Sequence, residues 1–257
     1  MSRKVKKILY PIITFACFIC LWAIAVANSS SQIVFPSPWE VFGRFFHMLT
    51  HKVGNYYSIF GHVLWSLSRV LIGFSIAGVL GTVLGLTMGW FKYVRAIFKP
   101  IFDMLRPIAP LAWIPLSILW FGIGEEYKYF LIFIAAFVPF TLNAFAGAMH
   151  VDSQLKGAAQ MLGASKSQLF FQIVVPSSVP SIFSGAQVAL SNAWMTMLAA
   201  EMVCATEGVG WIIIAGQSVN DMTQMLAGMV GIGIVGLLLA TGMRKLEERC
   251  LRWKTGK

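Results

Sequence analysis

Two ionisable side chains inside long apolar segments, Arg69 and Glu201, are the residues of this chain best placed to do chemistry. A charged group at membrane depth is costly, so it commonly marks an ion pair, a solute pathway or a proton relay. Each residue lies near the end of its apolar run, which leaves two alternatives. The two side chains could form an ion pair, or each could reach solvent or lipid headgroups separately.

Polar uncharged side chains within the same runs form a second set of candidates. Asn192 and Thr196 are four residues apart and therefore share one face of a helix. Such groups hydrogen-bond between helices or face a polar solute. If such groups face a solute, we expect its path to be lined by residues among Arg69, Asn143, Asn192, Thr196 and Glu201. For an anionic solute, Arg69, Asn192 and Thr196 are the first candidates.

Metal and redox chemistry find little support in the sequence. His47 and His51 have the i, i+4 spacing of metal ligands on a helix, but they lack a third ligand, which favours a solvated helix face. Cys17 and Cys20 form a CxxC inside an apolar run without a nearby His, which favours packing. We therefore expect no metal site, no catalytic cluster and no cofactor bound by this chain.

The elements that must position these residues are membrane helices, because the composition excludes a soluble domain. The chain has 257 residues, of which 58% are hydrophobic and 12% charged, whereas soluble domains are about 25% charged. About 20 apolar residues in a helix cross the hydrocarbon layer. We therefore expect one all-α integral membrane domain over residues 1–257, with six spans at about 8–27, 67–90, 100–121, 129–148, 180–200 and 224–243.

Proline interrupts the third of these spans. Pro107, Pro110 and Pro115 each remove a backbone donor and bend a helix. Freed carbonyl groups are tolerated in a membrane where they are buried in protein or face water. A broken helix here could line a solute path, or it could fit its neighbours without any role in transport.

Small residues and short helices complete the expected architecture. Glycines at 81, 85 and 89 repeat every four residues on the second span, which favours close helix packing over solute contact. Residues 203–221 hold too few apolar residues to span, and we expect a short helix there at the outer face. Residues 39–49 are expected to form an interfacial amphipathic helix.

Basic residues predict the orientation of the chain. With the N-terminus in the cytoplasm, six spans return the C-terminus to the same side and place 16 of the 20 Lys and Arg residues there, as the positive-inside rule requires. The other side receives Arg44, Lys52, Arg69 and Lys128. The formal net charge of +10 then reflects topology and the anionic inner leaflet of the lipid bilayer. Because the basic residues are scattered over loops, no nucleic-acid partner is expected.

A cytoplasmic segment at about residues 150–178 separates the fourth and fifth spans. Asp152 is a suitable N-cap, Gly163 interrupts the helix that follows, and Pro176 ends a second helical stretch. We therefore expect two short helices in an L shape along the membrane surface. Alanines on one side would allow the close approach of another protein, and a plain interfacial helix is the alternative.

The same segment resembles the EAA loop of ABC importer permeases, a pattern of EAA, three residues, Gly, nine residues, Ile, one residue, Leu and Pro. The spacing is matched by Ala158, Ala159, Gly163, Ile173 and Pro176. Gly157 replaces the usual Glu, which removes a possible charged contact, and Val175 replaces the usual Leu. Residues 105–124 and 199–202 resemble the branch of these permeases that serves nitrate, sulfonates and taurine.

The resemblance implies a type I ABC importer transmembrane domain in the bacterial cytoplasmic membrane, without enzymatic activity of its own. Its expected partners are a cytoplasmic ABC ATPase dimer, an extracytoplasmic solute-binding protein and a second copy of the chain. ATP and Mg²⁺ would be bound by the ATPase. The residues expected to couple to the ATPase are Gly157, Ala158, Ala159, Gly163, Ala164, Ser165, Ile173 and Pro176.

An ion-coupled secondary transporter that acts without an ATPase is the alternative. The sequence has no GxxxxGK[ST] stretch, so the energy for transport must come from a partner or from a gradient. A secondary transporter would be expected to carry inverted repeats and buried carboxylates for ion coupling. No convincing repeat is present, and the acids within or beside the six spans are Asp103 and Glu201, which favours the ATP-driven importer.

Overall fold

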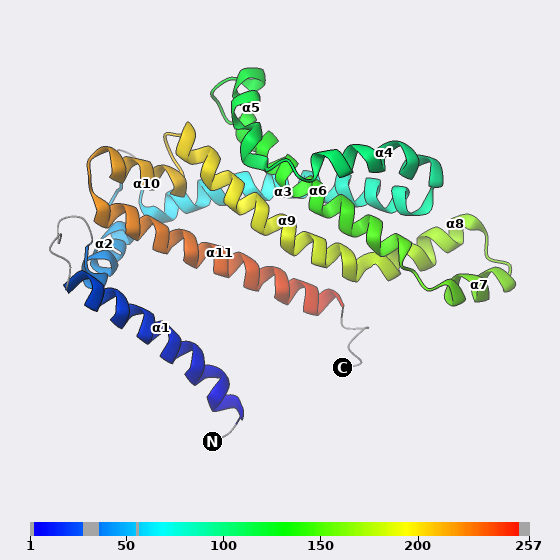
Figure 1. Ribbon diagram of the computed structural model, residues 1–257, viewed down its shortest axis with the longest axis horizontal. Coiled ribbons are helices and arrows are strands. Elements are labelled where there is room, and N and C mark those ends of the chain that lie inside the picture. Colours follow the sequence, from blue (N-terminus) through cyan, green and yellow to red (C-terminus); the bar gives the residue numbers. More distant parts are fainter. Residues whose placement is uncertain (1–2, 28–35, 55–56, 252–257) are drawn as a thin grey trace.

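The computed structural model describes residues 3–27, 36–54 and 57–251, and these form a bundle of helices (Figure 1). In chain order the elements are α1 (Arg3–Ala27), α2 (Pro38–Thr50), α3 (Ile59–Trp90), α4 (Lys92–Leu105), the 3₁₀-helix η1 (Pro110–Trp113), α5 (Ile114–Phe121), α6 (Glu126–Met149), α7 (Ser153–Met161), α8 (Lys166–Gln168), the π-helix η2 (Leu169–Val174), α9 (Val175–Val203), α10 (Val209–Ser218) and α11 (Met222–Cys250). Within the described ranges, extended pairing is limited to an isolated bridge between Val53 and Tyr57. The predicted all-α architecture is confirmed.

The centre of the bundle is formed by α3, α6 and α9, which pack against one another, with α11 beside α9 (Figure 1). The largest core cluster joins the three central helices through residues such as Val70, Ile132 and Met197. Figure 1 shows α2 and α10 at one end of the bundle and α7 at the other, and we refer to these as the α10 end and the α7 end. Both predicted short helices are confirmed, as α2 and α10.

Glycines allow the close approach of α3 and α6. An added Cβ on Gly81 would lie 2.9 Å from the Phe140 Cβ, and one on Gly85 would lie 2.7 Å from the Ala144 Cβ. Gly89 meets Ala148 in the same way one turn further along. Real side chains do not tolerate such distances, so the predicted packing role of the three glycines is confirmed.

Four of the described helices are long and apolar enough to cross a membrane, namely Ile59–Trp90, Glu126–Met149, Lys166–Val203 and Met222–Cys250. The bent pair of α4 and α5 would count as a fifth, and the apolar part of α1 within the described residues, Ile13–Ala27, is shorter. Large apolar side chains point outward from these helices, including Val79 and Leu237. Such a surface suits lipid or another protein, and the count of six spans stays a prediction.

The third predicted span is a sharply bent pair of helices, as its prolines indicated, and whether the pair forms one span over residues 100–121 stays a prediction. The two parts, Lys92–Leu105 and Pro110–Phe121, meet at 91°. Pro107 lies in the turn after α4, and Pro110 opens the 3₁₀-helix with its fixed φ. Pro115 falls at the start of α5, where a missing N–H costs nothing, so it does not bend the chain.

The segment between α6 and α9 departs from the predicted pair of short helices. Asp152 caps α7 as expected, because its side chain accepts a hydrogen bond from the Gln154 amide at 2.8 Å. Gly163 breaks the helix with a φ of 83°. The expectation that Pro176 ends a second short helix is wrong, because α8, η2 and α9 form one continuous helix, Lys166–Val203.

The reason is the π-helical turn that precedes Pro176. In η2 the Val175 amide donates to the Phe170 carbonyl, five residues back instead of four. Widening the helix by one residue relieves the clash between a proline ring and the preceding turn. Pro176 therefore sits in the first turn of α9 without stopping the chain. The rest of the predicted L shape, the turn at Gly163, is present.

The close approach of α3 and α6 can be tested by adding a single methyl group. We expect Gly85→Ala to destabilise the protein by about 1–3 kcal/mol, the usual cost of overpacking a core. Gly233→Ala on α11 is the matched control, because an added Cβ there has no neighbour within 4 Å. Thermal unfolding in detergent would report both, and a Gly85→Ala protein as stable as the control would contradict the packing.

Candidate functional site

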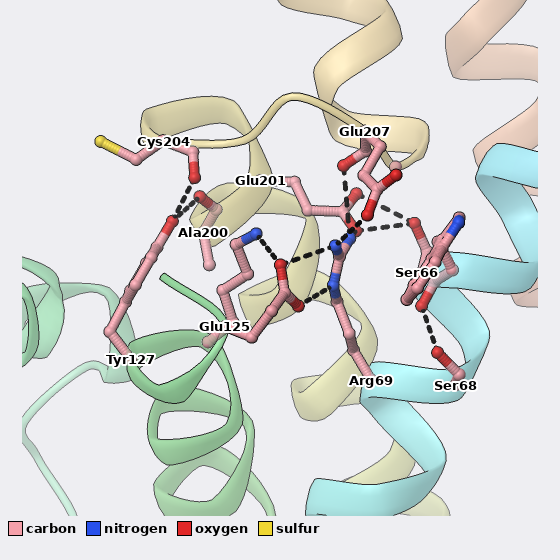
Figure 2. A network of polar contacts seen from close by, with 12 residues as sticks. Ser66, Ser68, Arg69, Glu125, Tyr127, Ala200, Glu201, Cys204 and Glu207 are labelled. Carbon is pink, nitrogen blue, oxygen red and sulfur yellow. Dashed lines mark hydrogen bonds and ion pairs between the residues drawn. The ribbon is translucent and has the colours of Figure 1, made fainter. Parts of the chain in front are cut away.

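A cluster of charges around a buried arginine at the α10 end joins α3 and α9 to two connections of the chain (Figure 2). The Arg69 guanidinium of α3 lies 2.8 Å from Glu201 of α9 and 2.5 Å from Glu125, which precedes α6. It also lies 3.3 Å from Glu207, in the connection between α9 and α10. We call Ser66, Arg69, Glu125, Glu201 and Glu207 the Arg69 cluster.

The Arg69 and Glu201 side chains are both 0% exposed. Of the two sequence-based alternatives, the ion pair is therefore confirmed, and separate access to solvent or headgroups is wrong. Glu201 is fully hydrogen-bonded as well as paired. Its carboxylate accepts from the Ser66 hydroxyl at 2.8 and 3.0 Å and from the Gly210 amide at 2.9 Å. A buried charge is tolerated when it is paired and hydrogen-bonded in this way.

Side chains of α3 and α9 satisfy the first amides of α10, which would otherwise have no partner. The Gly208 amide donates to His62 at 3.1 Å, the Val209 amide to Ser66 at 2.9 Å, and the Gly210 amide to Glu201. A carboxylate at a helix N-terminus also interacts favourably with the helix dipole. The cluster therefore fixes where α10 begins.

Two glycines make this arrangement possible. Gly208 has a φ of 117°, and an added Cβ would collide with the Glu201 carboxylate. A Cβ on Gly210 would lie 2.6 Å from the Leu198 carbonyl oxygen and 2.9 Å from the Glu201 Cβ. Sequence reasoning did not assign a role to either glycine, to Glu207 or to Glu125. The available signal was the Glu-Gly-Val-Gly stretch at residues 207–210, which begins six residues after Glu201.

Glu125 is the most accessible member of the Arg69 cluster, with a side chain 42% exposed. It also accepts a hydrogen bond from Lys128 at 2.7 Å. Partial burial alone would raise the pKa of the Glu125 carboxyl, but the hydrogen bonds from Arg69 and Lys128 outweigh it and hold that pKa below its usual value. Next to it, the Tyr127 hydroxyl contacts the Ala200 and Cys204 carbonyls near the end of α9 (Figure 2).

A separate, partly open cavity of about 750 Å³ lies beside the bend between α4 and η1, and α6 and α9 line its other side. Asn143 and Asn192 line this cavity, so the structure brings two of the predicted path residues together. Thr196 is buried one turn away, and Arg69 and Glu201 belong to the Arg69 cluster instead. Their role in a path stays a prediction.

The predicted ATPase-coupling residues all lie at the α7 end, and none of them is buried. Gly157, Ala158 and Ala159 belong to α7, and Gly163 and Ala164 form the turn that follows. The remaining three are Ser165, which caps the start of α8, Ile173 of η2 and Pro176 of α9. Sequence reasoning missed Met161 and Leu162, which are 85% and 89% exposed at the tip. It also missed that Ser165 forms a capping box with Gln168, a pattern visible in the sequence.

The histidine pair behaves as a solvated surface feature. His47 and His51 are exposed, and their rings stack with centroids 3.9 Å apart. The described residues contain no group of three His, Cys, Asp or Glu side chains that could hold a metal ion.

Removal of the Glu201 side chain tests how much the Arg69 cluster contributes to the free energy of unfolding. We expect Glu201→Ala to lower the free energy of unfolding by about 3–5 kcal/mol, because it leaves a buried guanidinium short of a partner and the start of α10 uncapped. Glu248→Ala, on the exposed end of α11, is the matched control and should change little. Equal melting temperatures for the two variants would contradict this account.

Acid should weaken the Arg69 cluster through Glu125. Its folded pKa lies below the ordinary value of 4.5, so its stabilisation is present above pH 4.5 and is lost as the pH falls through the folded value. We expect the melting temperature of the native protein to fall below pH 4.5 more steeply than that of Glu125→Gln. Parallel curves would show that the Glu125 carboxylate contributes no pH-dependent stability.

Comparisons with known proteins place this architecture in a family. Residues 77–246 match the family model described as the inner membrane component of binding-protein-dependent transport systems. The chain is 33% identical to the taurine transport system permease TauC of Escherichia coli, over 90% of this chain and 84% of TauC. It is 32% identical to the nitrate import permease NrtB of a Synechocystis species, over 94% and 89% of the two chains.

A solved structure of the MetNI methionine ABC transporter shares the fold, with a TM-score of 0.58 at 19% identity over 72% of this chain and 96% of that chain. The chain is thus a multi-pass membrane protein with relatives along nearly its whole length. It belongs to the family of permease components of binding-protein-dependent ABC importers.

Proposed function

We propose that this chain forms the translocation path of an ATP-driven importer for a small anionic solute, in the group of nitrate, sulfonates and taurine, which an extracytoplasmic binding protein delivers. The observation that carries the proposal is the exposed α7 end. Met161 and Leu162 are apolar and almost fully exposed at the tip of a segment whose spacing matches the EAA loop. Exposed apolar side chains mark a surface that another protein or the membrane covers, and the match to the EAA loop favours a protein partner.

The partner that fits the α7 end is a cytoplasmic ABC ATPase dimer, which would bind ATP and Mg²⁺. The permease would then act as a homodimer in the bacterial cytoplasmic membrane, with both termini in the cytoplasm. The division of basic residues supports this orientation. The relatives that carry taurine and nitrate support the choice of solute group.

Force from the ATPase has a direct route into the membrane. The turn at Gly163 joins α7 to Lys166–Val203, a continuous helix of 38 residues. This helix passes the cavity at Asn192 and carries Glu201 of the Arg69 cluster in its last turn. A displacement at the α7 end would therefore be transmitted along one continuous helix to the start of α10.

Ion-coupled transport without an ATPase receives less support. Coupling to an ion requires a carboxylate that can bind and release it within the membrane. Among the described residues, Glu201 is the fully buried carboxylate, and Arg69, Ser66 and the Gly210 amide already occupy it.

Co-expression tests the proposed function. The chain is expressed with its cognate ATPase and binding protein, purified in detergent and reconstituted in liposomes. The proposal predicts that the ATPase co-purifies with the chain. It also predicts that solute uptake requires ATP on the side of the liposome membrane where the ATPase lies. Uptake that proceeds without the ATPase and follows an ion gradient would support the secondary transporter instead.

The two glycines of the α7 segment provide a matched test of coupling. An added side chain has open space at both positions, but Gly163 has a φ of 83°, which side chains rarely adopt, whereas Gly157 has no such constraint. We expect Gly163→Val to reduce ATP-driven uptake at least about tenfold because the turn is distorted. Gly157→Ala should retain near-native uptake. Equal uptake by the two variants would contradict a coupling role for the turn.

A further inference from the structure

We infer that the solute is an organic anion with an apolar, ring-sized body, and that the 750 Å³ cavity selects for that body against inorganic anions. The inference rests on the proposed function and narrows its solute class. A volume of this size falls in the range of about 300–1,000 Å³ typical of clefts that bury organic ligands.

The walls of the cavity are aromatic and aliphatic. Trp113 belongs to η1, Phe130, Phe137 and Phe145 belong to α6, and Val188 belongs to α9. An inorganic anion such as nitrate would lose hydration against these walls without gaining apolar contacts. An apolar ring would instead remove wall surface from water, which favours its binding. The walls therefore favour a solute with a hydrocarbon or aromatic portion.

Two carboxamides interrupt the apolar walls. The Asn143 side chain donates to the Pro139 carbonyl at 2.9 Å, which fixes its orientation and leaves its oxygen available. Asn192 is partly buried on α9 and forms no side-chain hydrogen bond with any described residue. The Asn192 amide is accessible from the cavity, because it is not among the buried polar atoms of the described residues that lack a partner, and it is therefore available to a solute.

The charges at the rim have a net positive sign. Lys99 and Asp103 of α4 form an ion pair at 2.6 Å and neutralise each other. Arg106, in the turn after α4, lines the same cavity and forms no ion pair with a described residue. A planar guanidinium binds carboxylates and sulfonates through paired hydrogen bonds. The cavity thus offers one cationic contact, one free amide and an apolar wall.

Benzenesulfonate and methanesulfonate carry the same sulfonate group, so a difference in their affinities measures the contribution of the apolar body. The complex of permease and ATPase is purified in lipid nanodiscs without the binding protein, and benzenesulfonate and methanesulfonate are titrated by calorimetry at constant ionic strength, with nitrate alongside. We expect benzenesulfonate to bind at least about tenfold more tightly than methanesulfonate or nitrate. Equal affinities, tighter binding of nitrate, or no measurable binding of benzenesulfonate would overturn the inference.

Variants then locate the binding site. Arg106→Gln and Asn192→Ala should each weaken benzenesulfonate binding about five- to tenfold, whereas Arg244→Gln on the exposed part of α11 should not. Phe130→Leu should weaken benzenesulfonate but leave methanesulfonate unchanged, and gel filtration of each complex confirms folding. Native affinity in all three cavity variants would also overturn the inference. Because the complex must contain the ATPase before any titration, loss of the ATPase would count against the proposed function, not against this inference.

Discussion

The buried Arg69 guanidinium is the constraint on which the α10 end of the molecule depends. It is surrounded by Glu125, Glu201 and Glu207, which come from three different parts of the chain. A charge in this position must be paired, so the start of α6, the end of α9 and the start of α10 must meet at one point. Glu201 completes the arrangement by capping α10. The ion pairs of Arg69 thereby position the connections before α6 and before α10.

The cavity depends on a second constraint, the break at Pro107 and Pro110. The chain bends by 91° there, and residues on both sides of the bend line the cavity together with α6 and α9. Prolines are tolerated there because the freed backbone groups lie beside a cavity. The cavity thus lies beside the proline break, and the Arg69 cluster lies at the α10 end. The long helix Lys166–Val203 connects both of them to the α7 end.

Much of this architecture could be predicted from the sequence because membrane helices have strong local signals. Apolar length, the four-residue spacing of Gly81, Gly85 and Gly89, and the cap at Asp152 all act within one helix or between neighbours. The π-helical turn before Pro176 could not be predicted, because proline normally stops a helix and the compensation is a matter of backbone geometry. The contacts of Glu125 and Glu207 with Arg69 were also missed, because they join residues 56 and 138 positions apart. Long-range ion pairs leave no periodic trace in a sequence.

The central claim is that the α7 end receives an ATPase. Site-specific photo-crosslinking from position 162 tests it most directly, because Leu162 is 89% exposed at that tip and Trp39 on α2 is a similarly exposed control at the opposite end. With the ATPase co-expressed in intact cells, the account predicts a crosslinked permease–ATPase adduct from position 162 and none from position 39. Absence of an adduct at 162, or an equal adduct at both positions, would contradict the account.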